Sequence, residues 1–552
     1  MPNRFYVIRT ALIVALGGFL MGFDASVISG VVGFIETEFA LTKAQLGFSV
    51  SSLTLTATLA MLVSGPLSDR FGRRKILFLA ATLYAISAIA SALAPSFGFL
   101  VAARMIGGLG VGASLIIAPL YIAEIAPPAM RGQMVSFNQL NIVIGITVAF
   151  FTNFLILQLA DSPAAWAQSL GLTDGPWRWM LGLETLPAIL YFVGLFFVPQ
   201  SPRWLLMQGR RDEALPIMKM AVGGVAATQE INEIEQSTAQ ERAEQAEADA
   251  RIQKRLQSGT PRAWIWAEQL IGKLKTLFSR PMWLVLSIGA VIGIVQQATG
   301  INAVFFYAPT IFEQSGIGTD ASFVQAIFVG VINLVFTLLA IALIDRLGRR
   351  PLLIGGLIGI TVAMGLLAYG FGNATYTLGP DAPAIVASGG DGLTPLIGQT
   401  FDNDVAFKTA LQDAIGVAAA TEYEAPLITS AITMNPMLIL IGILGFVASF
   451  AVSLGPVMWV LFSELFPNRI RGLAISFVGL INSAVSFGVQ QLFPVELAAL
   501  GAATTFAIFG AIAAAGLVFV VLVVPETKGK SLEELEAQLV RAPGSSLAAT
   551  PV

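Results

Sequence analysis

The chain contains no cysteine and no histidine among its 552 residues, and only 12% of its residues are charged. The absence of cysteine excludes disulfides and thiolate metal sites. Without histidine, proton chemistry near neutral pH falls to carboxylates whose pKa values are shifted by their surroundings. The sequence has no nucleophile arrangement, metal cluster or phosphate-binding loop. It therefore predicts no enzyme, no metal, no cofactor and no nucleic-acid partner.

Apolar residues, in contrast, are abundant, making up 56% of the chain, and the mean hydropathy is +0.78. Soluble domains carry about 25% charged residues, and a bilayer-spanning helix needs about 20 apolar ones. Apolar segments of that length predict an all-α polytopic membrane protein, embedded in the lipid bilayer, with twelve transmembrane helices at residues 10–32, 47–67, 76–95, 99–121, 134–159, 178–199, 282–308, 322–344, 352–371, 436–461, 472–497 and 503–524.

The basic residues lie almost entirely on one side of these predicted spans. The positive-inside rule makes that side cytoplasmic and places both termini there. Arg4 and Arg9 precede the first apolar run, but the run is long enough to span and no small-residue cleavage site closes a short core, so we expect no cleaved signal peptide. We expect a multi-pass protein of a prokaryotic inner membrane.

Three landmarks recur in the same order in the two halves of the chain. Asp69 to Arg74 resembles Asp345 to Arg350, and the stretch from Val198 resembles that from Val524. In the third landmark, Glu124 and Arg131 of the first half correspond to Glu464 and Arg471 of the second. Such a repeat indicates a duplicated six-helix unit. The repeated charges, namely Asp69, Arg73, Glu124, Arg131, Asp345, Arg349, Glu464 and Arg471, suggest latches that join the halves at the cytoplasmic side; the alternative is static topology determinants.

The predicted organisation has two six-helix bundles, residues 1–202 and 281–541, followed by a tail at 542–552. Residues 203–280 are charged and predict a cytoplasmic helical linker, with a coiled-coil partner site as the alternative. Residues 372–435 predict a long external loop between spans nine and ten, with a short helix around 404–420.

Three amides, Gln296, Gln297 and Asn302, interrupt the apolar run of span seven. Unpaired polar groups in hydrocarbon cost several kcal/mol by rough estimate, so these amides should line a pocket. On an ideal helix Gln297 and Asn302 would diverge by about 140°, so the helix must loosen near Gly300 to bring them together. Neutral donors and acceptors suit a hydroxyl-rich ligand; amide bonding between packed helices is the alternative.

Two charged residues lie inside other spans: Asp24 in span one and Arg104 in span four. Each costs about 2.5 to 3.5 kcal/mol or more at the bilayer centre, so they should face inward and pair. A pair that opens and closes is a proton switch, and a permanent ion pair is the alternative. Further polar or aromatic candidates within spans are Gln139, Asn333, Trp459 and Asn482.

The chain resembles the sugar porter family of the major facilitator superfamily. The resemblance rests on DRFGRR, DRLGRR, RMIGGLGVG, YIAEIAPPAMRG, SPRWL, QQATGIN, GPVMWVLFSELFPNRIRG and PETKGKSLEEL, in that order. It implies the major facilitator fold, with twelve helices in two pseudosymmetric bundles and alternating access to a central site. It assigns Gln139, Gln296, Gln297, Asn302, Asn333, Trp459 and Asn482 to the sugar.

Asp24 and Arg104 match the coupling pair of the bacterial xylose and related proton symporters, whereas facilitators of the family typically have Asn at the position of Asp24. Ile146 stands where the xylose symporter has a second Gln in span five, so xylose itself is not assigned. We predict a monomeric proton-coupled importer of a hexose, pentose or cyclitol, gated by bending of span seven at Gly300 and Tyr307 and by the cytoplasmic landmarks. The alternatives are an uncoupled facilitator, a non-transporting sugar receptor and a drug antiporter.

Overall fold

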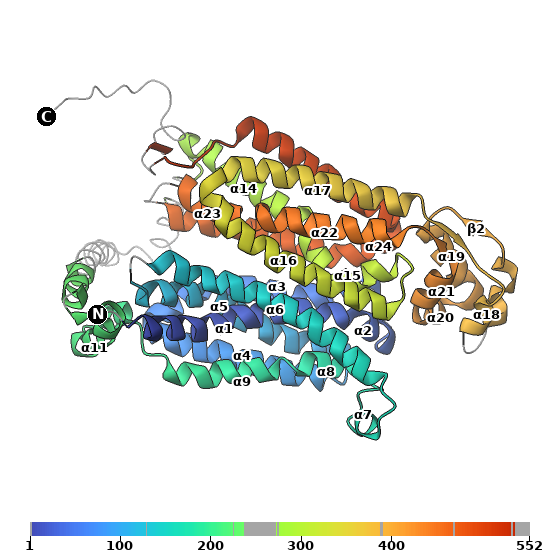
Figure 1. Ribbon diagram of the computed structural model, residues 1–552, viewed down its shortest axis with the longest axis horizontal. Helices are drawn as coiled ribbons and strands as arrows, with labels where there is room; N and C mark the ends of the chain where they lie inside the picture. Colours follow the sequence, from blue (N-terminus) through green and yellow to red (C-terminus); the bar gives the residue numbers. More distant parts are fainter. Residues whose placement is uncertain are drawn as a thin grey trace, which may run out of the picture.

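The computed structural model describes residues 3–127, 130–224, 226–236, 272, 275, 277–386, 390–466, 470–530 and 534–535. Eleven helices in this part of the chain are long and apolar enough to cross a membrane. They form two bundles that lie side by side (Figure 1). The chain enters the first described helix and leaves the last transmembrane one at the same end of the bundles, called here the termini end, and residues 373–386 and 390–435 lie at the other, the insertion end.

The N-terminal bundle contains six spans. Span one is α1 (Arg4–Val27), extended by η1 (Ile28–Gly30), and span six is divided between α8, α9 and η3. The bounds of the other elements are α2 (Val32–Glu38), α3 (Lys43–Phe71), α4 (Arg73–Ala92), α5 (Phe97–Ile125), α6 (Arg131–Ala160), α7 (Ala165–Ser169), α8 (Pro176–Gly182), α9 (Thr185–Gly194) and η3 (Leu195–Phe197). Each of the first five predicted spans coincides with one helix, and the sixth coincides with α8, α9 and η3 together.

Glycines let the helices of this bundle approach closely. A Cβ at Gly112 on α5 would lie 2.1 Å from the backbone oxygen of Ala57 on α3, and one at Gly22 on α1 would lie 1.9 Å from that of Ile142 on α6. Only glycine fits such contacts without moving a backbone. The glycine run after Arg104 therefore positions α5 against α3.

The C-terminal bundle follows η4 (Arg280–Met282). Its elements are α14 (Trp283–Ala298), α15 (Ile301–Glu313), α16 (Thr319–Leu347), α17 (Arg349–Gly372), α22 (Pro436–Val452), α23 (Leu454–Leu465) and α24 (Arg471–Val523). At 53 residues α24 is too long for one crossing, and Gly501 interrupts it with a φ of 77°. It therefore supplies spans eleven and twelve, so the predicted twelve passes are confirmed.

The segment predicted as an external loop is a folded subdomain, which corrects that expectation. It comprises β1 (Thr375–Thr377), α18 (Ala382–Ile385), η5 (Gly390–Leu396), β2 (Thr400–Phe401), α19 (Asp404–Ile415), α20 (Val417–Glu422), α21 (Glu424–Ala431) and β3 (Ile432–Thr433). The strands form an antiparallel sheet in the order β2-β1-β3. A separate core, in which Tyr376 stacks on Phe407 at 5.2 Å, explains why the segment folds. We call it the insertion domain.

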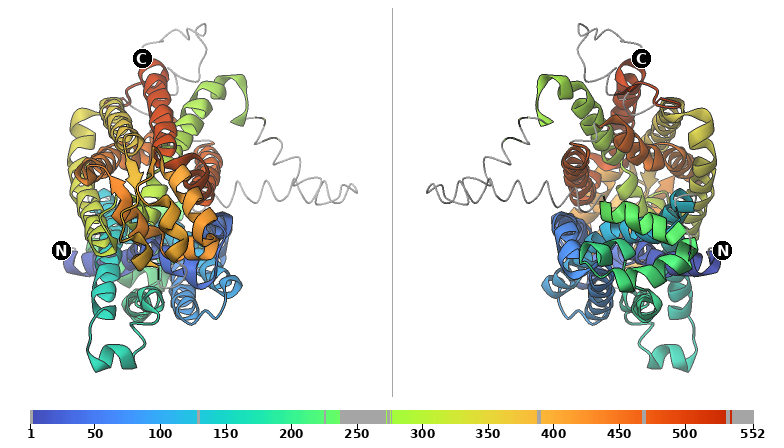
Figure 2. Two further views of the ribbon diagram at one scale, coloured as in Figure 1. Left: turned by 90° about the vertical axis from the view of Figure 1, so that its right-hand side faces the viewer. Right: turned by 90° about the vertical axis from the view of Figure 1, so that its left-hand side faces the viewer.

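The insertion domain is fixed to the C-terminal bundle at the bend in α24. The Asp404 carboxylate accepts a hydrogen bond of 3.2 Å from the backbone N–H of Ala502, at the start of span twelve. A Cβ at Gly501 would lie 2.4 Å from Asp404 Oδ1, so glycine is required there by both the backbone angle and the contact. Figure 2 shows this domain facing the viewer in its left view.

The linker at the termini end begins with α10 (Pro202–Met207) and α11 (Arg211–Val222). These helices lie across the termini end in the right view of Figure 2. Most of the predicted linker after residue 236 lies outside the described residues, as does the tail at 542–552.

Candidate sugar and proton site

Four of the predicted sugar-binding amides meet in one hydrogen-bonded cluster in the C-terminal bundle. The Gln296 side-chain oxygen accepts bonds from Asn482 at 2.7 Å and Gln297 at 3.1 Å. The Gln297 oxygen accepts one from Asn302 at 2.7 Å. Each amide bonds to another member of the cluster, and Gln296, Asn302 and Asn482 also donate to Leu454, Ser486 and Gly293, which meets the requirement for polar groups at this depth. A hydroxyl-rich ligand would have to replace these bonds with its own.

The turn at Gly300 brings these amides together. α14 ends at Ala298 and α15 begins at Ile301, with Gly300 between them at a φ of 89°. A Cβ there would lie 2.5 Å from the Phe509 ring. The loosening of span seven inferred from the spacing of Gln297 and Asn302 is present, and glycine permits it through its left-handed backbone.

The other predicted sugar residues lie outside this hydrogen-bonded cluster. Asn333 is buried on α16, Gln139 is an exposed residue of α6 in the other bundle, and Trp459 on α23 is 48% exposed. Trp459 packs edge-on against Phe462 at 6.0 Å. Their roles toward a sugar remain predictions.

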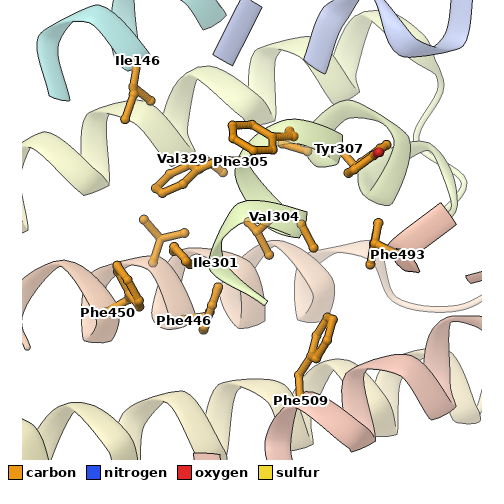
Figure 3. Close-up of a cluster of buried hydrophobic side chains, with 14 of the residues drawn as sticks. Ile146, Ile301, Val304, Phe305, Tyr307, Val329, Phe446, Phe450, Phe493 and Phe509 are labelled. Atoms are coloured by element: carbon orange, nitrogen blue, oxygen red, sulfur yellow. The ribbon is translucent and has the colours of Figure 1, made fainter. Parts of the chain in front are cut away.

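An aromatic and apolar layer separates the amide cluster from the insertion end. Tyr307 is buried beside Phe493, with ring centroids 5.1 Å apart, and its hydroxyl donates to the backbone oxygen of Gln490 at 3.3 Å. Figure 3 shows Tyr307 and Phe493 side by side, and Ile146 reaching the same cluster from the N-terminal bundle. Tyr307 is also where α15 departs from helical geometry, with φ of -127°. The predicted gating residue Tyr307 thus lies in this aromatic and apolar layer, called here the seal.

Asp24 and Arg104 form a buried ion pair inside the N-terminal bundle. Arg104 Nη1 lies 3.3 Å from Asp24 Oδ1, and both side chains are at most 3% exposed. Arg104 also donates from Nε to the backbone oxygen of Ser49 at 3.0 Å. The second carboxylate oxygen of Asp24 has no hydrogen-bond partner among the described residues. The pair is therefore held by one carboxylate oxygen of Asp24, and the guanidinium is fixed by the backbone of Ser49.

A second buried carboxylate, Glu184, lies between α8 and α9 and was missed by the sequence analysis. It interacts electrostatically with Asp24 and Arg104. Its Oε1 has no hydrogen-bond partner among the described residues. The sequence could have indicated Glu184 as a candidate, because an acidic residue within the apolar run of span six is as costly as one in span one.

The repeated charges form two matching networks at the termini end. In the N-terminal bundle Arg73 pairs with Asp69 at 2.7 Å and with Glu124 at 2.9 Å. In the C-terminal bundle Arg349 pairs with Asp345 at 3.2 Å and Glu464 at 2.8 Å. The repeat in the sequence is thus a repeat of ion pairs in space.

These networks lie within the bundles, whereas the sequence analysis expected latches between them. Each arginine pairs with carboxylates of its own half, so the landmark pairs tie helices of one bundle together in this conformation. Arg471 donates to the backbone oxygen of Phe466 at 3.0 Å. The side chain of Arg131 lies outside the described residues.

Hydrogen bonds between the bundles occur on the insertion side of the membrane-spanning region. Ser51 on α3 donates to Gln491 on α24 at 2.8 Å, and Gln158 on α6 donates to Asp320 on α16 at 3.2 Å. The bundles are therefore joined at the insertion end. A cavity of about 830 Å³ lies beyond this seal, between both bundles and the insertion domain.

Two six-helix bundles, each with buried polar or charged side chains, define a multi-pass membrane carrier with the major facilitator fold, not an enzyme. The chain matches the family model described as "Sugar (and other) transporter" over residues 10–387 and 411–539. It belongs to that sugar transporter family. The unmatched residues 388–410 fall within the insertion domain.

Individual relatives agree with the family. The D-xylose-proton symporter of Escherichia coli K12 is 34% identical over 97% of this chain and 96% of its own. The arabinose-proton symporter of Bacillus subtilis is 34% identical over 96% and 94%. The inward open structure of the E. coli xylose transporter XylE aligns with a TM-score of 0.69 and 31% identity. The alignment covers 97% of this chain and 100% of that one.

Proposed function

We propose that the protein imports a monosaccharide together with a proton by alternating access. The observation that carries the proposal is the buried pair of Asp24 and Arg104, with one carboxylate oxygen unpartnered among the described residues, in a chain that also holds a polar amide cluster in its C-terminal bundle. A buried charge of this kind is costly and is a functional group by default. Relatives named as xylose- and arabinose-proton symporters support the same function.

The sugar would be a hexose, a pentose or a cyclitol, bound by Gln296, Gln297, Asn302 and Asn482 and completed by Gln139, Asn333 and Trp459. Amides donate and accept at once, as a ring of hydroxyls requires. Relatives are named for xylose, arabinose and glucose, so the proposal stays at the class of monosaccharides.

The insertion end would face outward, and the termini, linker and arginine landmarks would face the cytoplasm of a bacterial cell. The excess of Lys and Arg near the termini end supports this orientation. The described conformation, joined at the insertion end, is then closed toward the outside. We infer that one copy of the chain suffices for transport, because each bundle pair encloses its own site.

The test is uptake of labelled D-xylose, L-arabinose and D-glucose into vesicles holding the purified protein, with and without an inward proton gradient. A potential of about 100 mV supplies roughly 2.3 kcal/mol per proton, or about fiftyfold accumulation. We expect gradient-driven accumulation by the wild type. Asp24→Asn should retain exchange and downhill flux but lose accumulation, and Asp161→Asn, at the end of α6, is the matched control.

Equal downhill flux in wild type and Asp24→Asn, indifferent to the gradient, would overturn proton coupling and leave an uncoupled facilitator. Sugar binding without any flux would instead identify a receptor.

A further inference from the structure

Gln490 is a buried amide of α24 that the transport function described above does not use. It is 1% exposed in an apolar helix. Asn482, Ser486 and Gln490 are spaced four residues apart, so they lie along one face of α24. The first of these belongs to the amide cluster, which places Gln490 two helical turns from the proposed sugar site.

Hydrogen bonds connect Gln490 to the sugar amides. Its Nε2 donates to Ser486 Oγ at 2.8 Å. The same hydroxyl accepts from Asn302 Nδ2 at 2.7 Å, and Asn302 also donates to Gln297 at 2.7 Å. Ser486 therefore bridges Gln490 and Asn302 without either amide touching the other.

At its other end Gln490 bonds to the opposite bundle. Thr54 on α3 donates from its hydroxyl to Gln490 Oε1 at 2.8 Å. The backbone oxygen of Gln490 accepts from the hydroxyl of Tyr307, in the seal at the insertion end. A continuous relay thus runs from Thr54 in one bundle, through Gln490 and Ser486, to Asn302 in the other.

We infer that this relay couples closure at the insertion end to the orientation of the sugar-binding amides, with Gln490 as its positioning residue. The inference rests on the proposed function. When the bundles part at the insertion end, Thr54 leaves Gln490, whose buried acceptor then lacks a donor. An unsatisfied buried amide is unfavourable, so Gln490 turns or hydrates and Ser486 and Asn302 lose their fixed orientation.

Coupling of this kind is reciprocal. If closure orients Asn302 for sugar, then sugar bound to Asn302 favours closure by the same factor. The net worth of one neutral hydrogen bond sets that factor at about threefold to tenfold. Thr54, which does not belong to the sugar site, should therefore affect sugar affinity.

The test compares Thr54→Val with Thr58→Val. Both replace a hydroxyl by a methyl of similar size on α3, but Thr58 donates to the backbone oxygen of Thr54 in its own helix, at 2.8 Å. Binding of D-xylose, L-arabinose and D-glucose to purified protein is measured, together with the rise in unfolding temperature that each sugar causes. We expect Thr54→Val to weaken binding threefold to tenfold and to reduce the sugar-dependent rise, with Thr58→Val like wild type.

A double-mutant cycle completes the test. Thr54 and Ser486 share Gln490 but no bond of their own, so Thr54→Val, Ser486→Ala and the double variant should weaken binding by similar factors if the relay operates. Effects that multiply, or a Thr54→Val protein that binds as Thr58→Val does, would overturn the relay while leaving the proposed transport intact. A wild type that binds none of the three sugars would overturn both.

Discussion

At the scale of single residues, the structure separates glycines that permit a contact from glycines that only lie on a helix. Gly112 and Gly98 both belong to α5. A Cβ at Gly112 would lie 2.1 Å from a backbone oxygen of α3, whereas one at Gly98 would have no heavy atom within 4 Å. The same substitution should therefore have opposite effects at the two positions.

We expect Gly112→Ala to lower the free energy of unfolding by about 1 to 3 kcal/mol, because α3 and α5 must move apart. Gly98→Ala should be neutral or stabilising by up to about 1 kcal/mol, since alanine favours the helix. Thermal unfolding of the purified proteins measures both. Equal unfolding temperatures for the two variants would contradict the close contact at Gly112.

Candidate site residues could be picked out from the sequence only where a polar group was costly in its predicted span. Asp24, Arg104 and the amides of span seven were found in that way, and Glu184 could have been. Gln490 could not be distinguished from an ordinary helix contact, because its proposed role depends on a hydrogen bond from Thr54, more than 400 positions away in the chain. Periodicity does not predict a pairing between bundles.

At the scale of elements, α19 and α21 fix the insertion domain through a triad made of an ion pair and a neutral amide. Lys408 on α19 lies 3.0 Å from the Glu424 carboxylate on α21, and both bond to the side chain of Gln314 that follows α15. Burial alone would raise the pKa of Glu424, but the ammonium groups of Lys408 and Lys43 and these hydrogen bonds outweigh it and lower the pKa from 4.5 to about 2. The carboxylate therefore stabilises the docked domain when ionised.

The sign of the pH dependence follows from the lowered pKa. The stabilisation is complete above about pH 4.5 and is lost as the pH falls toward 2, and at most it is about 3 kcal/mol. Glu424→Gln should thus lower the unfolding temperature at pH 7 and progressively less at pH 4 and pH 3. Glu422→Gln, an exposed acid on α20, is the control. If Glu424→Gln lowered the unfolding temperature by the same amount from pH 7 to pH 3, the result would contradict a stabilising role of the triad.

Membrane-spanning elements were predictable because a long apolar run has few alternatives to a helix in a bilayer. The insertion domain was not, apart from its helix near Asp404. Its strands are two or three residues long, and its core forms from side chains of several short elements. Such a core is a tertiary property that a local pattern does not carry.

At the scale of the whole molecule, the repeated landmarks correctly predicted two equivalent halves but not how the halves contact each other. Arg73 and Arg349 satisfy the carboxylates of their own bundles here, and contacts between the bundles lie on the insertion side. A sequence repeat shows which residues of the two halves are equivalent. Which surfaces touch depends on the conformation, and a local sequence pattern does not carry that information.

The two halves also differ because the C-terminal half carries the insertion domain, which covers the insertion end. It is anchored to the C-terminal bundle through Asp404 and Gln314, yet α20 also contacts α2 of the N-terminal bundle. Thr37 on α2 and Thr421 on α20 line the same cavity of about 830 Å³. If the bundles part at this end during transport, the domain must move away from α2 with the C-terminal bundle.

The absence of native cysteine makes this motion directly testable. Thr37→Cys with Thr421→Cys, joined by a reducible bis-maleimide, should lower sugar uptake at least tenfold, because the link holds the insertion end closed. The control pair, Val405→Cys with Ala498→Cys, lines the same cavity but joins the domain to its own bundle, so uptake should persist. Cleaving the linker should restore transport in the first pair. Unimpaired uptake by fully linked Thr37/Thr421 protein would mean that the domain stays on α2 while sugar passes.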